Sequence, residues 1–142
     1  MAINYNLDRF VEAQENTYRI ALSELKRGEK QSHWMWYIFP QIARLGQSSN
    51  SKFYSLKSSD EARMYLHHEI LGKRLKEITQ VVLELENKSA YRIFDNPDYL
   101  KFKSCMTLFA FVSEEESLFH KALDKYFEGK NCDMTVYFLQ TE

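Results

Sequence analysis

Residues 96–112 read NPDYLKFKSCMTLFAFV, and this stretch decides the fold class. Asn96 is a good helix N-cap, and Pro97 suits the first helical position, where the missing backbone N–H has no partner in any case. The last six residues, 107–112, are rich in types that favour β-strands. Because no partner strand is evident elsewhere in the chain, we predict one helix over residues 97–112 and an all-α protein.

The sequence before this stretch also has helical spacing. Apolar side chains form one stripe from residue 7 to residue 25, which predicts a helix from Asn6 or Asp8 to just before Gly28. Glycine can take the left-handed conformation that ends a helix. The polar stretch at residues 47–51 predicts a loop.

Two Ser-x-x-Glu patterns predict capping boxes, one at Ser58–Glu61 and one at Ser113–Glu116. His67-His68 is a candidate junction between a helix that ends near residue 66 and a helix that begins near residue 69. Gly129 is a candidate end for the helix that Ser113 would begin. No internal repeat is visible, so we predict a single compact domain over residues 1–142 with about six to eight helices. Besides those already described, the predicted helices cover residues 58–66, 69–86, 89–94 and 113–128, with a short one from 133.

Composition narrows the class of protein. The 142 residues are 44% hydrophobic and 15% aromatic, and 19 basic against 20 acidic residues give a net charge of −1. This balance gives no general attraction to nucleic acid. No apolar run approaches the ~20 residues that a membrane helix needs, and the N-terminus lacks the regions of a secretory signal. We therefore predict a cytoplasmic protein that binds neither nucleic acid nor a membrane.

Strong catalytic motifs are absent from the sequence. There is no GxGxxG, GxxxxGK[ST], HExxH or GxSxG pattern, and the two cysteines, Cys105 and Cys132, have no metal-ligand spacing. We predict no metal site, and the sequence identifies no cofactor. Whether the protein is an enzyme stays open. If it is, His33 has the ordinary pKa best suited to moving a proton near neutral pH.

Residues 32–41, SHWMWYIFPQ, contain both tryptophans of the chain. Ser32 can cap a short helix, and Trp34 and Trp36 then point about 200° apart around it. The segment is therefore either buried on all sides or leaves aromatic surface facing a cleft. The core interpretation is favoured for Met35, Ile38 and Phe39, and both interpretations stay open for His33, Trp34 and Trp36.

A second candidate stretch lies inside the predicted helix 97–112. Lys101, Ser104 and Cys105 share one helix face, and a lysine with a hydroxyl one turn away can hold an anionic group such as phosphate. The alternative is a surface lysine above a serine that hydrogen-bonds to its own helix.

These two stretches, SHWMWYIFPQ and DYLKFKSCMTLF, resemble the signature of a bacterial family known as domain of unknown function 1810. The segments DRFVEAQENTYRIALSELKRGEK, EARMYLHHEILGKRLKE and FHKALDKYFEGKNCDMT fit the same family in order, so the resemblance covers nearly the whole chain. It implies a mainly helical single domain and provides no catalytic residue. Cys105 stands where the resemblance leads us to expect a second serine, which puts a role for that hydroxyl in doubt.

Three functional hypotheses arise from these stretches. The first, which we rank highest, is a pocket for a small molecule such as a nucleotide or a nucleotide derivative, with Lys101 or Arg63 meeting its anionic group. The second is a protein–protein interaction module with an exposed aromatic patch, and the third is that both stretches are core. The sequence leaves the oligomeric state open. The predicted ligand-binding residues are His33, Trp34, Trp36, Gln41, Lys101 and Ser104.

Overall fold

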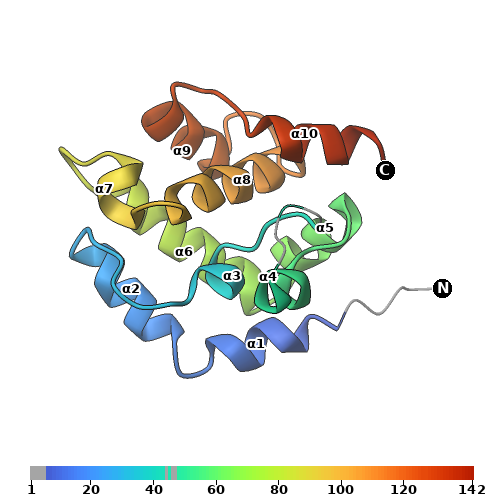
Figure 1. Ribbon diagram of the computed structural model, residues 1–142, viewed down its shortest axis with the longest axis horizontal. Helices are drawn as coiled ribbons and strands as arrows, with labels where there is room; N and C mark the ends of the chain where they lie inside the picture. The colour runs from blue at the N-terminus through green and yellow to red at the C-terminus, as the bar shows by residue number, and fades with distance from the viewer. Residues whose placement is uncertain (1–5, 44, 46–47) are drawn as a thin grey trace.

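The computed structural model of the chain describes residues 6–43, 45 and 48–142, and these residues form ten α-helices and no β-strand (Figure 1). An isolated parallel bridge joins Ile42 and Leu56. The all-α prediction is confirmed, and the predicted number of six to eight helices is too low. The helices are α1 Asp8–Gln14, α2 Tyr18–Lys26, α3 Met35–Ile38, α4 Ser49–Tyr54, α5 Ser59–His67, α6 Leu71–Glu84, α7 Ala90–Phe94, α8 Asp98–Phe111, α9 Leu118–Phe127 and α10 Asp133–Gln140.

One extra helix comes from a break near the N-terminus. The predicted helix up to Gly28 is in fact α1 and α2, separated by residues 15–17. The apolar stripe is interrupted here, because the buried side chain of this segment is the polar Gln14. Its amide donates to the Tyr37 carbonyl (2.8 Å) and the Tyr65 hydroxyl (3.1 Å), two partners far away in the sequence. Gly28 follows the end of α2 as predicted, with a φ of +83°.

The other unpredicted helix, α4, begins inside the polar stretch that we expected to be a loop. Ser48 is its N-cap, and the Ser48 hydroxyl accepts a hydrogen bond from the Ser51 backbone N–H (3.1 Å). Residue 47 of the predicted loop lies outside the described residues.

The predicted helix starts are correct in some places and wrong in others. The Ser58 hydroxyl caps α5 through the Glu61 N–H (3.2 Å), as predicted. The predicted box is incomplete, because the Glu61 side chain accepts the backbone N–H of Lys57 (2.7 Å) rather than that of Ser58. The cap predicted at Ser113 is wrong, because the chain turns through Glu116 (φ 62°) and α9 starts later, with Ser117 as N-cap and His120 completing a capping box. At α8 the N-cap is Pro97 rather than Asn96, and no side chain caps this helix.

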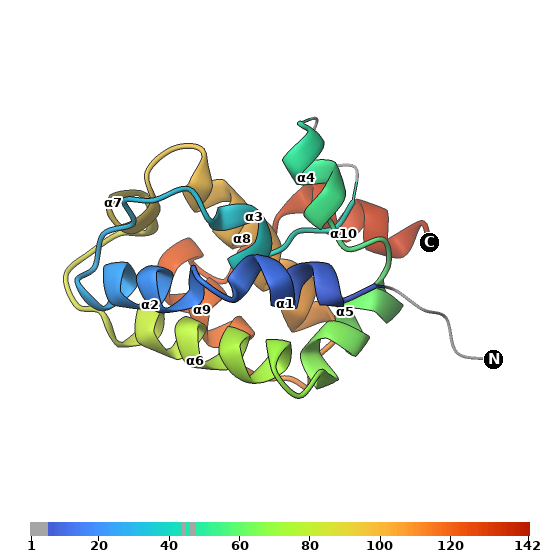
Figure 2. The ribbon, with the colours of Figure 1, turned by 90° about the horizontal axis from the view of Figure 1, so that it is seen from below.

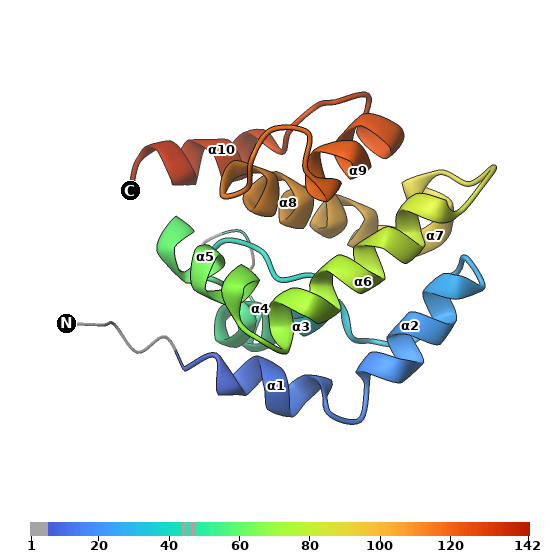
Figure 3. The ribbon, with the colours of Figure 1, turned by 180° about the vertical axis from the view of Figure 1, so that it is seen from behind.

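Two long helices organise the packing. In the view from behind, α6 crosses the molecule between α2 on one side and α9 on the other (Figure 3), and it contacts both. In the view from below, α1 and α2 run one after the other along the underside of the molecule as Figure 1 draws it (Figure 2). Helix α8 contacts α5, α7, α9 and α10. Residues 104–110 of α8 are buried among these neighbours, which explains why this part of the helix has no apolar stripe, whereas Phe111 at its end is exposed.

The corner between α5 and α6 is the junction predicted at His67-His68. The His68 Nδ1 accepts the backbone N–H groups of Ile70 (3.1 Å) and Leu71 (3.2 Å) and so satisfies the start of α6. A Cβ on Gly72 would lie 1.9 Å from the Leu66 carbonyl oxygen, so only glycine allows this close approach. In the part of the chain that the structure describes, none of the helices has the length and apolar character needed to span a bilayer.

Candidate functional site

Trp34 belongs to the core. Its side chain is entirely buried, and its indole Nε1–H donates to the Glu24 carboxylate (2.9 Å). Glu24 is itself buried and also accepts the backbone N–H groups of Gln31 (2.8 Å) and Ser32 (2.9 Å) and the Ser32 hydroxyl (2.5 Å). The helix cap predicted at Ser32 is therefore wrong, because this hydroxyl is bound to Glu24 instead.

The hydrogen bonds to Glu24 determine its protonation. Burial by itself raises the pKa of this carboxyl group, but the four donors outweigh burial and lower the pKa to about 2. Glu24 is thus ionised at neutral pH and fixes the start of the SHWMWYIFPQ stretch to α2.

Trp36 lies differently, although it is only two residues further along. Its ring is half-buried on α3, and the Lys101 Nζ lies 5.1 Å from the ring centre, in cation–π contact. No described residue hydrogen-bonds to the Trp36 indole N–H. His33 is exposed, and its imidazole also has no partner among residues 6–43, 45 and 48–142. Met35, Ile38 and Phe39 are buried, as the core interpretation predicts.

A carboxylate joins Lys101 to a second lysine. One oxygen of Asp98 lies 3.4 Å from the Lys101 Nζ, and the other lies 2.8 Å from the Lys30 Nζ. Lys30 also donates to the Ser32 carbonyl (2.5 Å). We call Lys30, Trp36, Asp98 and Lys101 the lysine–tryptophan cluster. Through it the structure brings the two predicted stretches into contact.

Sequence reasoning missed two members of this cluster. Asp98 is three residues before Lys101, which places it on the same helix face, and this spacing is a signal that could have identified it. Lys30 stands just before the aromatic stretch, and only the fold brings it to Asp98, 68 positions away in the numbering.

A hollow of about 300 Å³ adjoins the cluster, and Lys30 forms part of its wall. Two further cations line it. The Lys88 Nζ donates to the Gly28 carbonyl (3.1 Å), whereas the Arg92 guanidinium has no partner in the described part of the chain. Glu29 and Asp95 are the acidic residues of this hollow, so its lining carries one net positive charge.

The other predicted site residues make contacts outside the cluster. The Ser104 hydroxyl donates to the Leu100 carbonyl (3.1 Å) and lies 3.2 Å from the Cys132 Sγ, at the start of α10. The Gln41 carbonyl accepts from the Leu56 N–H (2.8 Å). Arg63 forms an exposed ion pair with Asp60 (3.0 Å). The structure thus groups Trp36 and Lys101 of the predicted set and leaves Ser104 in contact with another region.

The two cysteines are unpaired and differ in environment. Burial raises the pKa of the Cys105 thiol. Burial also acts to raise the pKa of Cys132, but hydrogen bonds, led by that of the Ser104 hydroxyl, lower it overall. The Ser104 hydroxyl is thus bonded to its own helix, as the alternative interpretation predicts, and lies against the Cys132 thiol.

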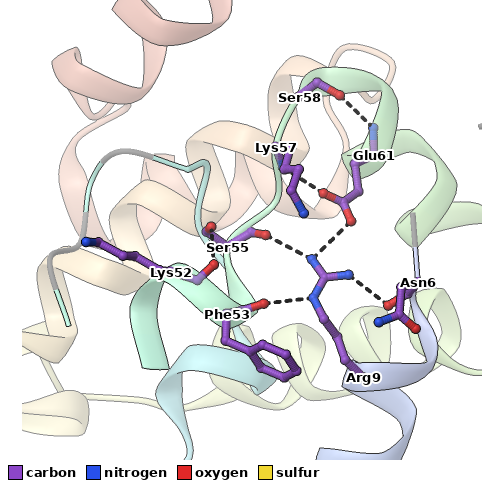
Figure 4. Close-up of polar contacts among 8 residues, drawn as sticks. All are labelled: Asn6, Arg9, Lys52, Phe53, Ser55, Lys57, Ser58 and Glu61. Atoms are coloured by element: carbon purple, nitrogen blue, oxygen red, sulfur yellow. Dashed lines mark hydrogen bonds and ion pairs between the residues drawn. The ribbon is translucent and has the colours of Figure 1, made fainter. Parts of the chain in front are cut away.

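A separate, buried ion pair holds the N-terminal helix. Arg9 of α1 donates to the carbonyls of Asn6 (2.8 Å), Phe53 (2.8 Å) and Ser55 (2.9 Å) and to the Glu61 carboxylate (3.0 Å), as Figure 4 shows. The Arg9 and Glu61 side chains are 5% and 0% exposed. We call this arrangement the Arg9 clamp. It joins α1, α5 and the end of α4 and leaves its carboxylate no access to solvent.

Comparison with known proteins gives a family and a fold. Residues 4–139 match the family described as "Protein of unknown function (DUF1810)". The chain is similar to the crystal structure of the conserved hypothetical protein Rv1873 from Mycobacterium tuberculosis, with 42% identity and a TM-score of 0.94 over 96% of this chain and 97% of that one. No curated protein matches the chain.

Proposed function

This chain belongs to the DUF1810 family of proteins of unknown function, and we propose that it binds an anionic small molecule, such as a nucleotide or a nucleotide derivative, at the lysine–tryptophan cluster. One observation carries the proposal: Lys101 lies against a half-buried indole and is only loosely paired with a carboxylate that a second lysine contacts more closely. Two ammonium groups thus share one carboxylate.

The distances show which lysine is available. Lys30 lies 2.8 Å from Asp98, and its side chain is 7% exposed, so it is committed to that carboxylate. Lys101 lies 3.4 Å away, and its side chain is 23% exposed. An anion can therefore take Lys101 from Asp98 without leaving a buried charge unpaired, since Lys30 still neutralises Asp98.

Trp36 adds a reason to expect a planar group in the ligand. Its indole N–H is free to donate, and its ring becomes accessible when Lys101 turns toward an anion. The adjoining hollow of about 300 Å³ is at the small end of the usual range for ligand pockets, and the free Arg92 guanidinium there suits a phosphate group. If the bound molecule reacts, the exposed His33 imidazole is the group we propose to move a proton.

The protein–protein interaction module is our second candidate. This hypothesis needs Trp34, Trp36 or Tyr37 on an exposed patch, and the burial of Trp34 removes one of these three side chains. Tyr37 is half-buried, and its ring packs on Tyr54 with 5.2 Å between ring centres. The small-molecule site keeps first place because Lys101 and Arg92 are available for an anion, whereas much of the aromatic surface is already covered.

The test is a thermal-shift screen with nucleotides, dinucleotides and sugar phosphates on the parent protein. A ligand at ~100 times its Kd adds about 2.7 kcal/mol of stability, which raises the Tm by several degrees. We expect Lys101→Gln and Trp36→Leu to lose this shift. Lys26→Gln, an exposed lysine on α2, is the matched control and should retain it.

Two results would contradict the proposal. One is that none of these compounds raises the Tm of the parent protein. The other is that a compound raises the Tm of Lys101→Gln and Trp36→Leu as much as that of the parent. A concentration-dependent oligomer lost in Trp36→Leu would instead support the interaction module.

A further inference from the structure

A larger hollow, of about 720 Å³, lies on another part of the molecule. It is formed by the end of α5, one side of α6 and the segment that joins α8 to α9. Its volume falls well within the range of small-molecule pockets. It shares no residue with the lysine–tryptophan cluster, so a ligand bound in this hollow is independent of the proposed function.

The lining of this hollow is apolar on one part and basic on another. Leu66, Val112, Leu118 and Phe119 supply the apolar part. Phe119 is buried, whereas the other three are half-buried and keep surface that a ligand can cover. A ligand that gains from this surface must have an apolar body.

The basic groups are free to bind an anion. Lys76 of α6 and Lys121 of α9 both line the hollow, are exposed, and have no ion-pair or hydrogen-bond partner in the described part of the chain. Glu114 is the acidic residue of the lining, so with His67 neutral the hollow has one net positive charge in a chain of net charge −1. The His67 Nδ1 is bonded to the Arg63 carbonyl (2.8 Å), which makes Nδ1 the donor and leaves Nε2 unpartnered among the described residues.

We propose that this hollow binds a small organic acid with an apolar body, of the kind that a medium-chain carboxylate represents. The apolar side chains would cover the chain of the acid, and Lys76 and Lys121 would hold its carboxylate. The first turn of α9 adds partial positive charge on the same side, because Leu118 and Phe119 belong to that turn and line the hollow. An inorganic anion would use only the lysines, and an alcohol only the apolar part.

The experiment is a titration with octanoate, followed by NMR through the backbone amides of the parent protein. We expect shifts at residues 66–67, 76–80 and 112–121. Octylammonium and 1-octanol have an apolar chain of similar length without the negative charge. Each should bind at least about tenfold more weakly than octanoate. Lys76→Glu and Lys121→Glu should each raise the octanoate Kd by about tenfold.

Two control variants make the result specific. Lys26→Glu reverses an exposed charge on α2 and should leave the octanoate Kd unchanged. Lys101→Gln removes the cation of the proposed nucleotide site and should also leave it unchanged, so failure of one proposal is separated from failure of the other. The inference is overturned if octanoate shifts none of the amides that line the hollow. It is also overturned if 1-octanol binds as tightly as octanoate, or if Lys76→Glu and Lys121→Glu both keep the parent Kd.

Discussion

Trp34 and Trp36 stand two residues apart in the sequence and lie in opposite environments. Trp34 is fully buried, and its indole N–H is bonded to Glu24, whose carboxylate accepts three further hydrogen bonds. Trp36 is half-buried under Lys101, and its N–H has no partner in the described residues. Around Trp34 the polar groups are hydrogen-bonded and buried. Around Trp36 the indole N–H has no partner among the described residues, and Lys101 is only loosely paired with Asp98.

This difference teaches how to separate structural from binding residues in one motif. A buried polar group must be satisfied within the protein, because an unsatisfied one costs stability. Such a group has nothing left to offer a ligand. The Arg9 clamp has the same character as the Trp34 side, since its carboxylate is 0% exposed and bonded. The lysine–tryptophan cluster has the opposite character and is therefore the candidate site.

The largest expected effect tests the contrast between the two tryptophans. Trp34→Ala should lower the free energy of unfolding by an amount near the upper end of roughly 3–5 kcal/mol, because it leaves a large cavity and removes a donor from Glu24. Trp36→Ala should cost about 1 kcal/mol, since its ring is only half-buried. Urea unfolding followed by circular dichroism measures both, and equal losses would remove the distinction.

The Arg9 clamp supplies the next effect. Glu61→Gln should destabilise the protein by about 3–4 kcal/mol, because Arg9 then remains as a buried charge without its counter-ion. The control is the neighbouring Asp60→Asn, which removes an exposed pair with Arg63 and should cost under about 1 kcal/mol. A loss at Glu61 no larger than at Asp60 would show that the clamp is not a structural element.

The pKa of Glu24 predicts a pH dependence on the Trp34 side. The folded-state pKa is about 2, below the ordinary value of 4.5, so Glu24 stabilises the protein above pH 4.5 and this contribution is lost as the pH falls toward 2. The total is about 3 kcal/mol. Urea unfolding between pH 5 and pH 2 should show a shallower slope for Glu24→Gln than for the parent. Glu29→Gln, at an exposed position, should keep the parent slope.

The smallest effect belongs to the candidate site. Lys101→Gln should change the free energy of unfolding by less than about 1 kcal/mol, because its pair with Asp98 is long and partly exposed. Chemical denaturation gives the value. A loss comparable to that of Glu61→Gln would mean that Lys101 is part of the scaffold, and the lysine–tryptophan cluster would then lose its place as a binding site.

Local signals in the sequence predicted several elements correctly. The hydroxyl of Ser58 starts α5, and Gly28 has a positive φ, because capping and left-handed turns depend on a few neighbouring residues. The break between α1 and α2 was not predicted. Its position is explained by Gln14, whose partners Tyr37 and Tyr65 are 23 and 51 residues away. Nothing in the local sequence indicates that this glutamine is buried.

The sequence by itself determined that this chain is helical and that it resembles the DUF1810 family. It identified Trp36 and Lys101 as candidate site residues but did not identify Lys30 and Asp98. It could not decide which tryptophan faces the core, because the segment is apolar on all sides and no polar face orients it. Tertiary structure decided this by placing Glu24 beneath Trp34 and Lys101 over Trp36. A short helix is oriented by the partners that satisfy its polar atoms, and those partners come from distant parts of the chain.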